Sequence, residues 1–372
     1  MRPSVDFGPR AVTSCRGIWN PWRKTFGTGS NSFRTQKSEH DVVSAPNARI
    51  LREASRDVPV VVCLSLVAAL ENVFSDRPAC RRSHLMLTPS LRSSPKVICL
   101  LDVFTPDFAL EKFQTFYMVM PFVAQDLGHI MKRRRLSERI ITYLFYQLLR
   151  GLKYIHSAGI IHRDLKPGNL AVNENCELKI LDFGLARQTE SEMTGYVVTR
   201  WYRAPEVIFN WMHYTQTVDV WSAACILAEM ITSQVLFPGH DSIDQLKKIL
   251  RLTGTPDSSL VQRMQSKDAQ SYVQGLPAQK KKNFKEVFPS LDENAVDLME
   301  GMLLLDPEMR LTAKQGLSHP FLAEYHDLES ESDSEPYDDS FESMELAVGE
   351  WKSLIHMEIV TFDPDNPSKT AM

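Results

Sequence analysis

The sequence predicts an α+β fold in which a large, mainly helical unit follows an incomplete β-rich part. A stretch with apolar residues at helical spacing begins after Ser137. Two very short apolar segments, Leu170–Val172 and Leu178–Leu181, are separated by turn residues and predict a hairpin on the helical body. Residues 1–95, in contrast, have Gly, Pro, Ser and Arg spread through them and show weak periodicity. The ordered core should therefore lie mainly in the helical unit.

The other elements follow from local patterns. Ser137 can cap the helix that follows it. Short apolar runs predict strands at Val97–Phe104 and Phe116–Phe122. Helical spacing recurs at Val218–Thr232, Asp241–Thr253 and Glu293–Leu305, and Pro307 ends the last of these.

Charge is distributed unevenly along the 372 residues. Residues 1–95 contain 14 Lys/Arg and 7 Asp/Glu, although the whole chain carries −4. Such a basic front is typical of a nucleic-acid arm, of a targeting segment, or of two unrelated sequences that have been joined. The longest apolar run, Val58–Leu70, contains Pro59 and is too short to cross a bilayer, so no membrane span is expected. The six cysteines include no Cys-x-x-Cys pair, which argues against common zinc and redox motifs.

The strongest chemical signal is a pair of ordered motifs. Residues 162–169 read His-Arg-Asp-Leu-Lys-Pro-Gly-Asn, and residues 182–184 read Asp-Phe-Gly. Phosphoryl transfer needs a base near the attacking hydroxyl, a cation near the transferred group and oxygen ligands for magnesium. Asp164 and Lys166 supply the first two, and Asn169 and Asp182 supply the ligands. Either motif alone is weak, but the ordered pair is a strong signal.

A second signal lies between Asp182 and Glu206. This stretch contains Thr194-Gly195-Tyr196 and ends in Ala204-Pro205-Glu206. A loop with a Thr and a Tyr between such anchors suits a switch, because added phosphate can pair with nearby arginines and order the loop.

From Val97 to about Thr361 the chain resembles a stress-activated mitogen-activated protein kinase. Thr-Gly-Tyr is the dual-phosphorylation motif of that class, and residues 101–106 and 195–202 fit it closely. Residues 209–212 and the tail 368–372 point to the gamma subtype. The resemblance implies a protein-kinase-like fold with four parts. They are an unmatched, poorly ordered or aberrant segment 1–95, a remnant of the small-lobe strands at 96–120, a complete helical lobe at 121–322, and an acidic extension at 323–372 that lies along the small lobe.

The resemblance also implies roles for the motif residues. Asp164 would be the catalytic base, Lys166 would contact the phosphate, and Thr199 would position both. Asn169 and Asp182 would bind Mg²⁺. The residues expected to hold ATP are Met120, Pro121, Val123, Lys166, Asn169 and Leu170. Glu206 would pair with Arg310 inside the helical lobe.

Regulation and partners are implied in the same way. Upstream dual-specificity kinases would phosphorylate Thr194 and Tyr196. Asp338 and Asp339, with Glu174 as a companion, would bind basic docking peptides of substrates and activators, although a plain solvated acidic tail is the alternative. Thr370 and Met372 suit the C-terminal pattern captured by PDZ domains. A monomer in cytoplasm and nucleus, without nucleic-acid partners, is expected.

One half of such a kinase is missing from the sequence. Gly27-Thr28-Gly29 begins a Gly-rich loop, but Ser32 stands where the third Gly belongs. Between Lys37 and Lys96 there is no lysine at all, so the strand lysine that grips the phosphates has no candidate. Two interpretations follow: a proline-directed serine/threonine kinase, or a catalytically impaired splice form that acts as a docking or scaffold protein.

Overall fold

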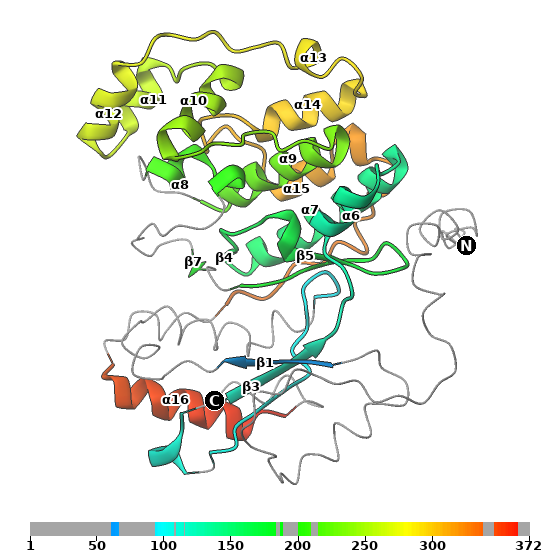
Figure 1. The fold of residues 1–372 in the computed structure, drawn as a ribbon, viewed down its shortest axis with the longest axis vertical. Helices are drawn as coiled ribbons and strands as arrows, with labels where there is room; N and C mark the ends of the chain where they lie inside the picture. The colour runs from blue at the N-terminus through cyan, green and yellow to red at the C-terminus, as the bar shows by residue number, and fades with distance from the viewer. Residues whose placement is uncertain are drawn as a thin grey trace.

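The structure, a computed structural model, describes residues 61–66, 94–107, 109–114, 116–183, 187–188, 200–209, 215–337 and 346–363. These residues form two regions, a small antiparallel sheet with a helix beside it and a larger helical body (Figure 1). The expected α+β architecture is confirmed.

The small sheet has the strand order β1-β3-β2. Its central strand, β3 (Phe116–Pro121), pairs antiparallel with β1 (Val61–Leu66) and with β2 (Asp102–Phe104). The strand predicted at Phe116–Phe122 is therefore confirmed. The strand predicted at Val97–Phe104 forms only over its last three residues, because Val97 pairs with β6 of the helical body instead.

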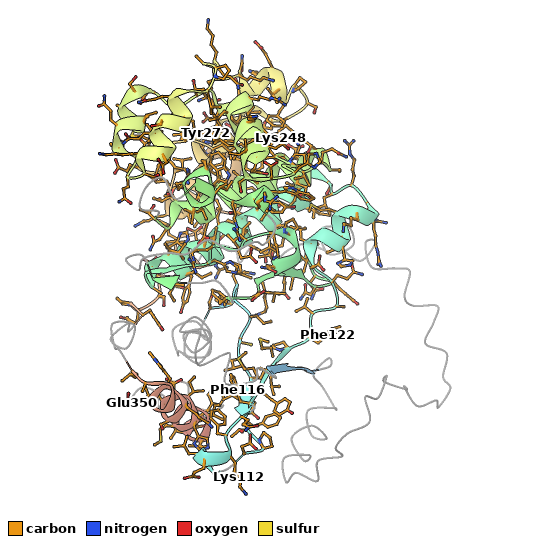
Figure 2. The ribbon with its side chains drawn as sticks, turned by 60° about the vertical axis from the view of Figure 1, so that its left-hand side comes forward. Lys112, Phe116, Phe122, Lys248, Tyr272 and Glu350 are labelled. Carbon is orange, nitrogen blue, oxygen red and sulfur yellow. The ribbon has the colours of Figure 1, made fainter. Side chains whose placement is uncertain are left out.

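A helix from the C-terminal part of the chain completes the small region. Helix α16 (Val348–Thr361) packs against β2 and the short helix η1 (Leu110–Lys112). The buried cluster that joins them comprises Leu100, Val103, Phe113, Phe116, Met118, Trp351, Ile355 and Ile359. In Figure 2, Phe116 and Glu350 mark the sheet and the helix, and Phe122 marks the chain as it leaves β3 toward the helical body. Helix α16, which is part of the expected extension, therefore lies against the small sheet.

The helical body is built around α7 (Glu138–Ser157) and α9 (Thr217–Thr232), whose side chains are mostly buried. Ser137 is the N-cap residue of α7, and the helices expected in these two stretches are confirmed. The others, including the two remaining expected helices, are α6 (Leu127–Arg133), α8 (Pro205–Phe209), α10 (Ser242–Thr253), α11 (Ser258–Arg263), α12 (Lys267–Gln274), α13 (Phe284–Val287), α14 (Glu293–Met302) and α15 (Ala313–Leu317).

Short strands lie on the side of the body that faces the small sheet (Figure 1). The predicted hairpin is confirmed as β5 (Leu170–Val172) paired with β6 (Leu178–Ile180). A second pair joins β4 (Ile160–Ile161) to β7 (Arg187–Gln188).

The two regions meet where residues 96–98 run beside β6. Ile180 donates its backbone N–H to Lys96 O at 2.8 Å, and Ile98 donates to Ile180 O at 2.9 Å. Gly151 of α7 lies under this contact. A Cβ there would stand 2.8 Å from Ile180 Cδ1 and 3.2 Å from Lys96 Cβ, so glycine permits the close approach.

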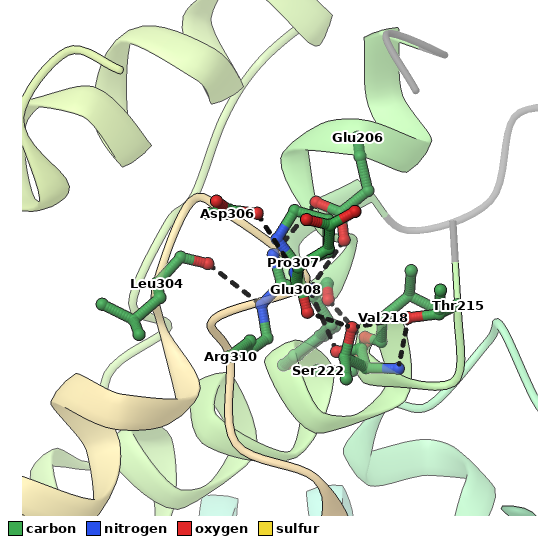
Figure 3. Close-up of polar contacts among 11 residues, drawn as sticks. Glu206, Thr215, Val218, Ser222, Leu304, Asp306, Pro307, Glu308 and Arg310 are labelled. Carbon is green, nitrogen blue, oxygen red and sulfur yellow. Dashed lines mark hydrogen bonds and ion pairs between the residues drawn. The ribbon is translucent and has the colours of Figure 1, made fainter. Parts of the chain in front are cut away.

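A buried ion pair joins α8 to the segment that precedes α15 (Figure 3). Arg310 Nη1 lies 2.6 Å from Glu206 Oε1, and Arg310 Nη2 lies 3.1 Å from Glu206 Oε2. Both side chains have 0% exposure. Arg310 also donates to the carbonyls of Leu304 and Thr217, so the guanidinium is satisfied on several sides. The expected Glu206–Arg310 pair is confirmed.

Candidate active site

The loop 162–169 takes its shape from a buried carboxylate on α9. Asp219 Oδ2 accepts the backbone N–H of His162, and Asp219 Oδ1 accepts that of Arg163, both at 2.8 Å. Arg163 has φ 65°, a left-handed conformation that a residue with a side chain rarely adopts. The two bonds to Asp219 hold the loop in that strained conformation, as is common at functional sites.

Asp219 is fully buried, and burial alone would raise its pKa. The hydrogen bond from His156, the nearby imidazoles and the backbone N–H of His162 outweigh burial and lower the pKa of Asp219 below its ordinary value. The carboxylate that shapes the loop is therefore ionised at neutral pH.

Asp164 lies at the centre of the loop and is only 8% exposed. Its Oδ2 accepts from Lys166 Nζ at 2.7 Å and from Asn169 Nδ2 at 3.2 Å. Asn169 Nδ2 also donates to the backbone carbonyl of Asp164 at 2.8 Å. The structure thus brings Asp164, Lys166 and Asn169 together within one hydrogen-bonded group, and it fixes the direction in which the carboxylate points.

Asp182 lies next to this loop and also has a left-handed backbone, with φ 58°. The neighbouring Phe183 is buried and packs edge-on against His162, with ring centroids 5.0 Å apart. His162 Nε2 donates to Leu181 O at 2.8 Å, and its Nδ1 accepts the N–H of Asp164 at 3.3 Å. One imidazole therefore couples the two motifs that the sequence singled out.

The metal-binding chemistry of Asn169 and Asp182 fits a hard cation. Because the amide nitrogen of Asn169 points to Asp164, its amide oxygen remains the group available to a cation. Asp182 adds an exposed carboxylate. Within the described residues there is no group of three or more His, Cys, Asp or Glu arranged around a metal. Two protein oxygens suffice for Mg²⁺, which keeps several waters and binds substrate phosphates.

The residues expected at the nucleotide lie where β3 leads into the helical body. Met120 and Pro121 end β3 and are half-buried, as is Val123 just beyond it. Asp126 forms an antiparallel bridge with Ala171, and Val172 donates to Gln125 O at 3.0 Å. These contacts bring the end of β3 beside Leu170, which is fully buried in the main core.

Two acidic residues that sequence reasoning missed also shape this site. Asp219 holds the loop 162–169 through its backbone, and its only sequence signal was an acid within a mainly apolar helix. Asp126 is the N-cap residue of α6, where it accepts the N–H of His129 at 2.9 Å. An acid followed by a helical pattern was the signal for it.

Several predicted residues fall outside the described part of the chain. These are Thr194, Tyr196, Thr199, Asp338, Asp339, Thr370 and Met372. Glu174 is described and lies exposed on the turn between β5 and β6.

The strand next to β3 is a place where the missing strand lysine could have been found. Strand β1 pairs with β3 from Val61 opposite Pro121 to Leu66 opposite Phe116. Its sequence is Val-Val-Cys-Leu-Ser-Leu. The sheet therefore has a strand beside the predicted nucleotide residues, and that strand contains no lysine.

Comparisons with known proteins identify the family to which these motifs belong. A protein kinase domain model matches residues 78–322. The chain is 57% identical over 282 residues to mouse mitogen-activated protein kinase 12, covering 74% of this chain and 77% of the relative. It is 59% identical over 268 residues to the human protein of the same name, covering 72% and 73%. It is also 58% identical over 268 residues to Xenopus laevis mitogen-activated protein kinase 14, covering 72% and 74%. Within the described residues, no helix is long and apolar enough to cross a membrane.

Proposed function

The chain belongs to the protein kinase family and, within it, to the stress-activated mitogen-activated protein kinases, which are serine/threonine kinases; from this premise we propose specific roles for its site residues. Asp164 accepts the proton of the attacking substrate hydroxyl. Lys166 places its positive charge beside the transferred phosphoryl group. The hydrogen-bonded group of Asp164, Lys166 and Asn169 is the single observation that carries this proposal.

Asn169 and Asp182 hold Mg²⁺, and the segment Met120–Val123 with Leu170 holds the adenine end of ATP. When bound, Mg-ATP supplies the phosphoryl group and the charge neutralisation that its transfer requires. The protein's own part is positional. Asp219 holds the loop, His162 joins it to the backbone carbonyl of Leu181 just before Asp182, and Asn169 orients Asp164. Such positioning accounts for most of the catalysis that a kinase provides.

Regulation and partners complete the proposal. Phosphorylation of Thr194 and Tyr196 by upstream dual-specificity kinases switches the loop that contains them, and Thr199 helps to position Asp164 and Lys166. Asp338, Asp339 and Glu174 bind basic docking peptides, and Thr370 with Met372 binds a PDZ domain. The monomer works in cytoplasm and nucleus on Ser/Thr-Pro sites.

A second candidate function is a docking protein with impaired catalysis. The observation in its favour is the absence of lysine from β1, the strand that lies beside Met120. An arginine elsewhere would not replace this lysine, because a planar guanidinium and a compact ammonium do not make the same phosphate contacts. Under this interpretation the helical lobe still binds partners, but phosphate transfer is slow.

Phosphotransfer by the purified chain separates the two functions. The protein, phosphorylated at Thr194 and Tyr196, is incubated with Mg-ATP and a Ser/Thr-Pro peptide beside an Asp164→Asn control. We expect turnover close to the Asp164→Asn background, because the strand lysine is missing. Robust turnover above that background would contradict the impaired interpretation.

Introducing a lysine into β1 then tests the roles proposed for the site residues. Val62 and Leu64 lie opposite Met120 and Met118 in the sheet register, so Val62→Lys and Leu64→Lys put a lysine on the strand paired with β3. One of the two variants should raise turnover by about 100-fold or more, and Asp164→Asn in the same background should remove the gain. Equal turnover in all variants would count against the proposed site.

A further inference from the structure

The connection between α6 and α7 carries an exposed run of basic residues. Lys132, Arg133, Arg134 and Arg135 are all exposed, and Arg139 lies in the first turn of α7. None of the three consecutive arginines forms an ion pair with another residue in the part of the chain that the structure describes. In a chain of net charge −4, this run is a local positive surface, and its three consecutive arginines have no acidic partner among the described residues.

A serine follows this run directly. Ser137 is exposed, and its hydroxyl makes no capping hydrogen bond to α7. Its backbone carbonyl accepts the N–H of Ile141 at 2.9 Å, so the backbone is held while the hydroxyl stays available. Arg134 has φ −159° and ψ 154°, and Ser137 has φ −74° and ψ 153°. Both conformations are extended, which is the form in which a peptide can lie along an enzyme groove.

We propose that Ser137 is a phosphorylation site for an arginine-directed serine/threonine kinase. Such an enzyme lines its peptide groove with carboxylates, which pair with guanidinium groups two and three residues before the serine. Arg135 and Arg134 occupy those positions. The γ-phosphoryl group of ATP is transferred to Ser137 Oγ: the O–P bond forms, the bond to ADP breaks, and the hydroxyl proton passes to the base of the modifying kinase.

The arrangement is specific within this chain. Arg134-Arg135-Leu136-Ser137 is its only Arg-Arg-x-Ser/Thr sequence. Ser55 and Ser266 have a single arginine three residues before them, and the Ser266 hydroxyl already accepts the N–H of Ala269 at 3.2 Å. Self-modification is not the source, since a proline-directed kinase needs Pro after the serine and Glu138 stands there.

The modified serine would change the charge of this surface. A phosphate adds a charge of about −1.5 to −2 and three acceptor oxygens, which can pair with Arg134, Arg135 and Arg139. Arg139 is available for this, because its 3.5 Å contact with Glu324 joins two side chains that are each 61% exposed. Such an exposed pair contributes little stability and is readily exchanged.

The full-length chain tests the proposal. The Asp164→Asn form, which cannot modify itself, is incubated with ATP and an arginine-directed probe kinase, the catalytic subunit of cyclic-AMP-dependent protein kinase. Phosphate is mapped by mass spectrometry. We expect close to one phosphate per chain at Ser137, and loss of that phosphate in Ser137→Ala. This variant should fold normally, since the hydroxyl caps nothing, and circular dichroism checks it.

The arginines and a matched serine provide the controls. Arg134→Gln/Arg135→Gln should lower the kcat/KM of the probe kinase at Ser137 by about tenfold or more. Ser258→Ala removes another exposed serine at a helix start, one without preceding arginines, and should leave incorporation unchanged. The proposal is overturned if the phosphate maps to Ser55 or Ser266 instead of Ser137, if Ser137 remains unmodified, or if the double arginine variant is modified as fast as the parent.

Discussion

The helical body and the small sheet region bury their side chains in different ways. In the helical body one continuous core surrounds α9, where residues such as Trp221 and Leu227 have 0% exposure. In the small region, the buried cluster among the described residues has eight side chains, three of which come from α16 near the end of the chain. The outer face of α16 leaves Leu354, Met357 and Val360 exposed at 44%, 60% and 54%. The helical body thus has one continuous core, whereas the core of the small region needs a helix from a distant part of the chain.

The candidate site contains residues from both regions. The residues that orient Asp164 are fastened to the helical body, chiefly through Asp219 on α9. The residues proposed to bind the nucleotide at the end of β3 belong to the small region. Damage to the small region should therefore weaken nucleotide binding and leave the catalytic loop in place.

The largest expected effect comes from breaking the buried ion pair of the helical body. Arg310→Met leaves the Glu206 carboxylate buried without its partner and removes the contact between the guanidinium and the ring of Trp221, 5.0 Å away. We expect the free energy of unfolding to fall by about 3–5 kcal/mol. Urea unfolding followed by tryptophan fluorescence measures it.

Arg263 offers the matched control for that change. It pairs with Asp306 and Glu308, but its side chain is 41% exposed. Arg263→Met should lower the free energy of unfolding far less than Arg310→Met does, because water screens an exposed ion pair. Equal losses in the two variants would mean that burial does not distinguish these pairs.

A smaller and more local effect is expected in the small region. Ile355→Ala removes a side chain of α16 that is 3% exposed and leaves a cavity against the sheet. The cost should be about 2–4 kcal/mol, confined to the opening of β2, β3 and α16. Hydrogen exchange should accelerate in β3 and stay unchanged in α9.

The neighbouring Leu354 gives the control, because it is 44% exposed on the same helix. Leu354→Ala should change stability by no more than about 0.5 kcal/mol. If Ile355→Ala also accelerated exchange throughout α9, the two regions would unfold as one unit and the comparison between them would fail.

The sequence predicted what local patterns can specify. Apolar spacing located α7 and α9, Ser137 marked the start of α7, and two motifs identified Asp164 and Asp182. Contacts between distant segments were not predictable. Asp219 binds backbone N–H groups more than fifty residues earlier, and no local pattern marks such a partner. The apolar run Val58–Leu70 contains β1, but no local pattern shows that this strand pairs with β3, fifty or more residues later.

The smallest expected effect lies at Lys96, where the two regions meet. Lys96 Nζ donates to Gln147 Oε1 of α7 at 2.6 Å. Burial, together with repulsion from Arg150 and Lys179, lowers the pKa of Lys96 from 10.5 to about 8, although Glu177 opposes the shift. Between pH 8 and 10.5 the unfolded chain therefore binds more protons than the folded one. Over that window the Lys96 contribution to stability rises with pH, and below pH 8 it is constant.

Lys96→Met removes this titration while it keeps an apolar stem against α7. From pH 7.5 to 9.5 the parent protein should gain about 1 kcal/mol relative to Lys96→Met, a figure discounted because the ammonium is partly exposed. Urea unfolding of both proteins at the two pH values gives the difference, which cancels the titration of all other groups. A constant difference would show that Lys96 keeps an ordinary pKa, and the contact between the two regions would then be more open to water than its hydrogen bonds indicate.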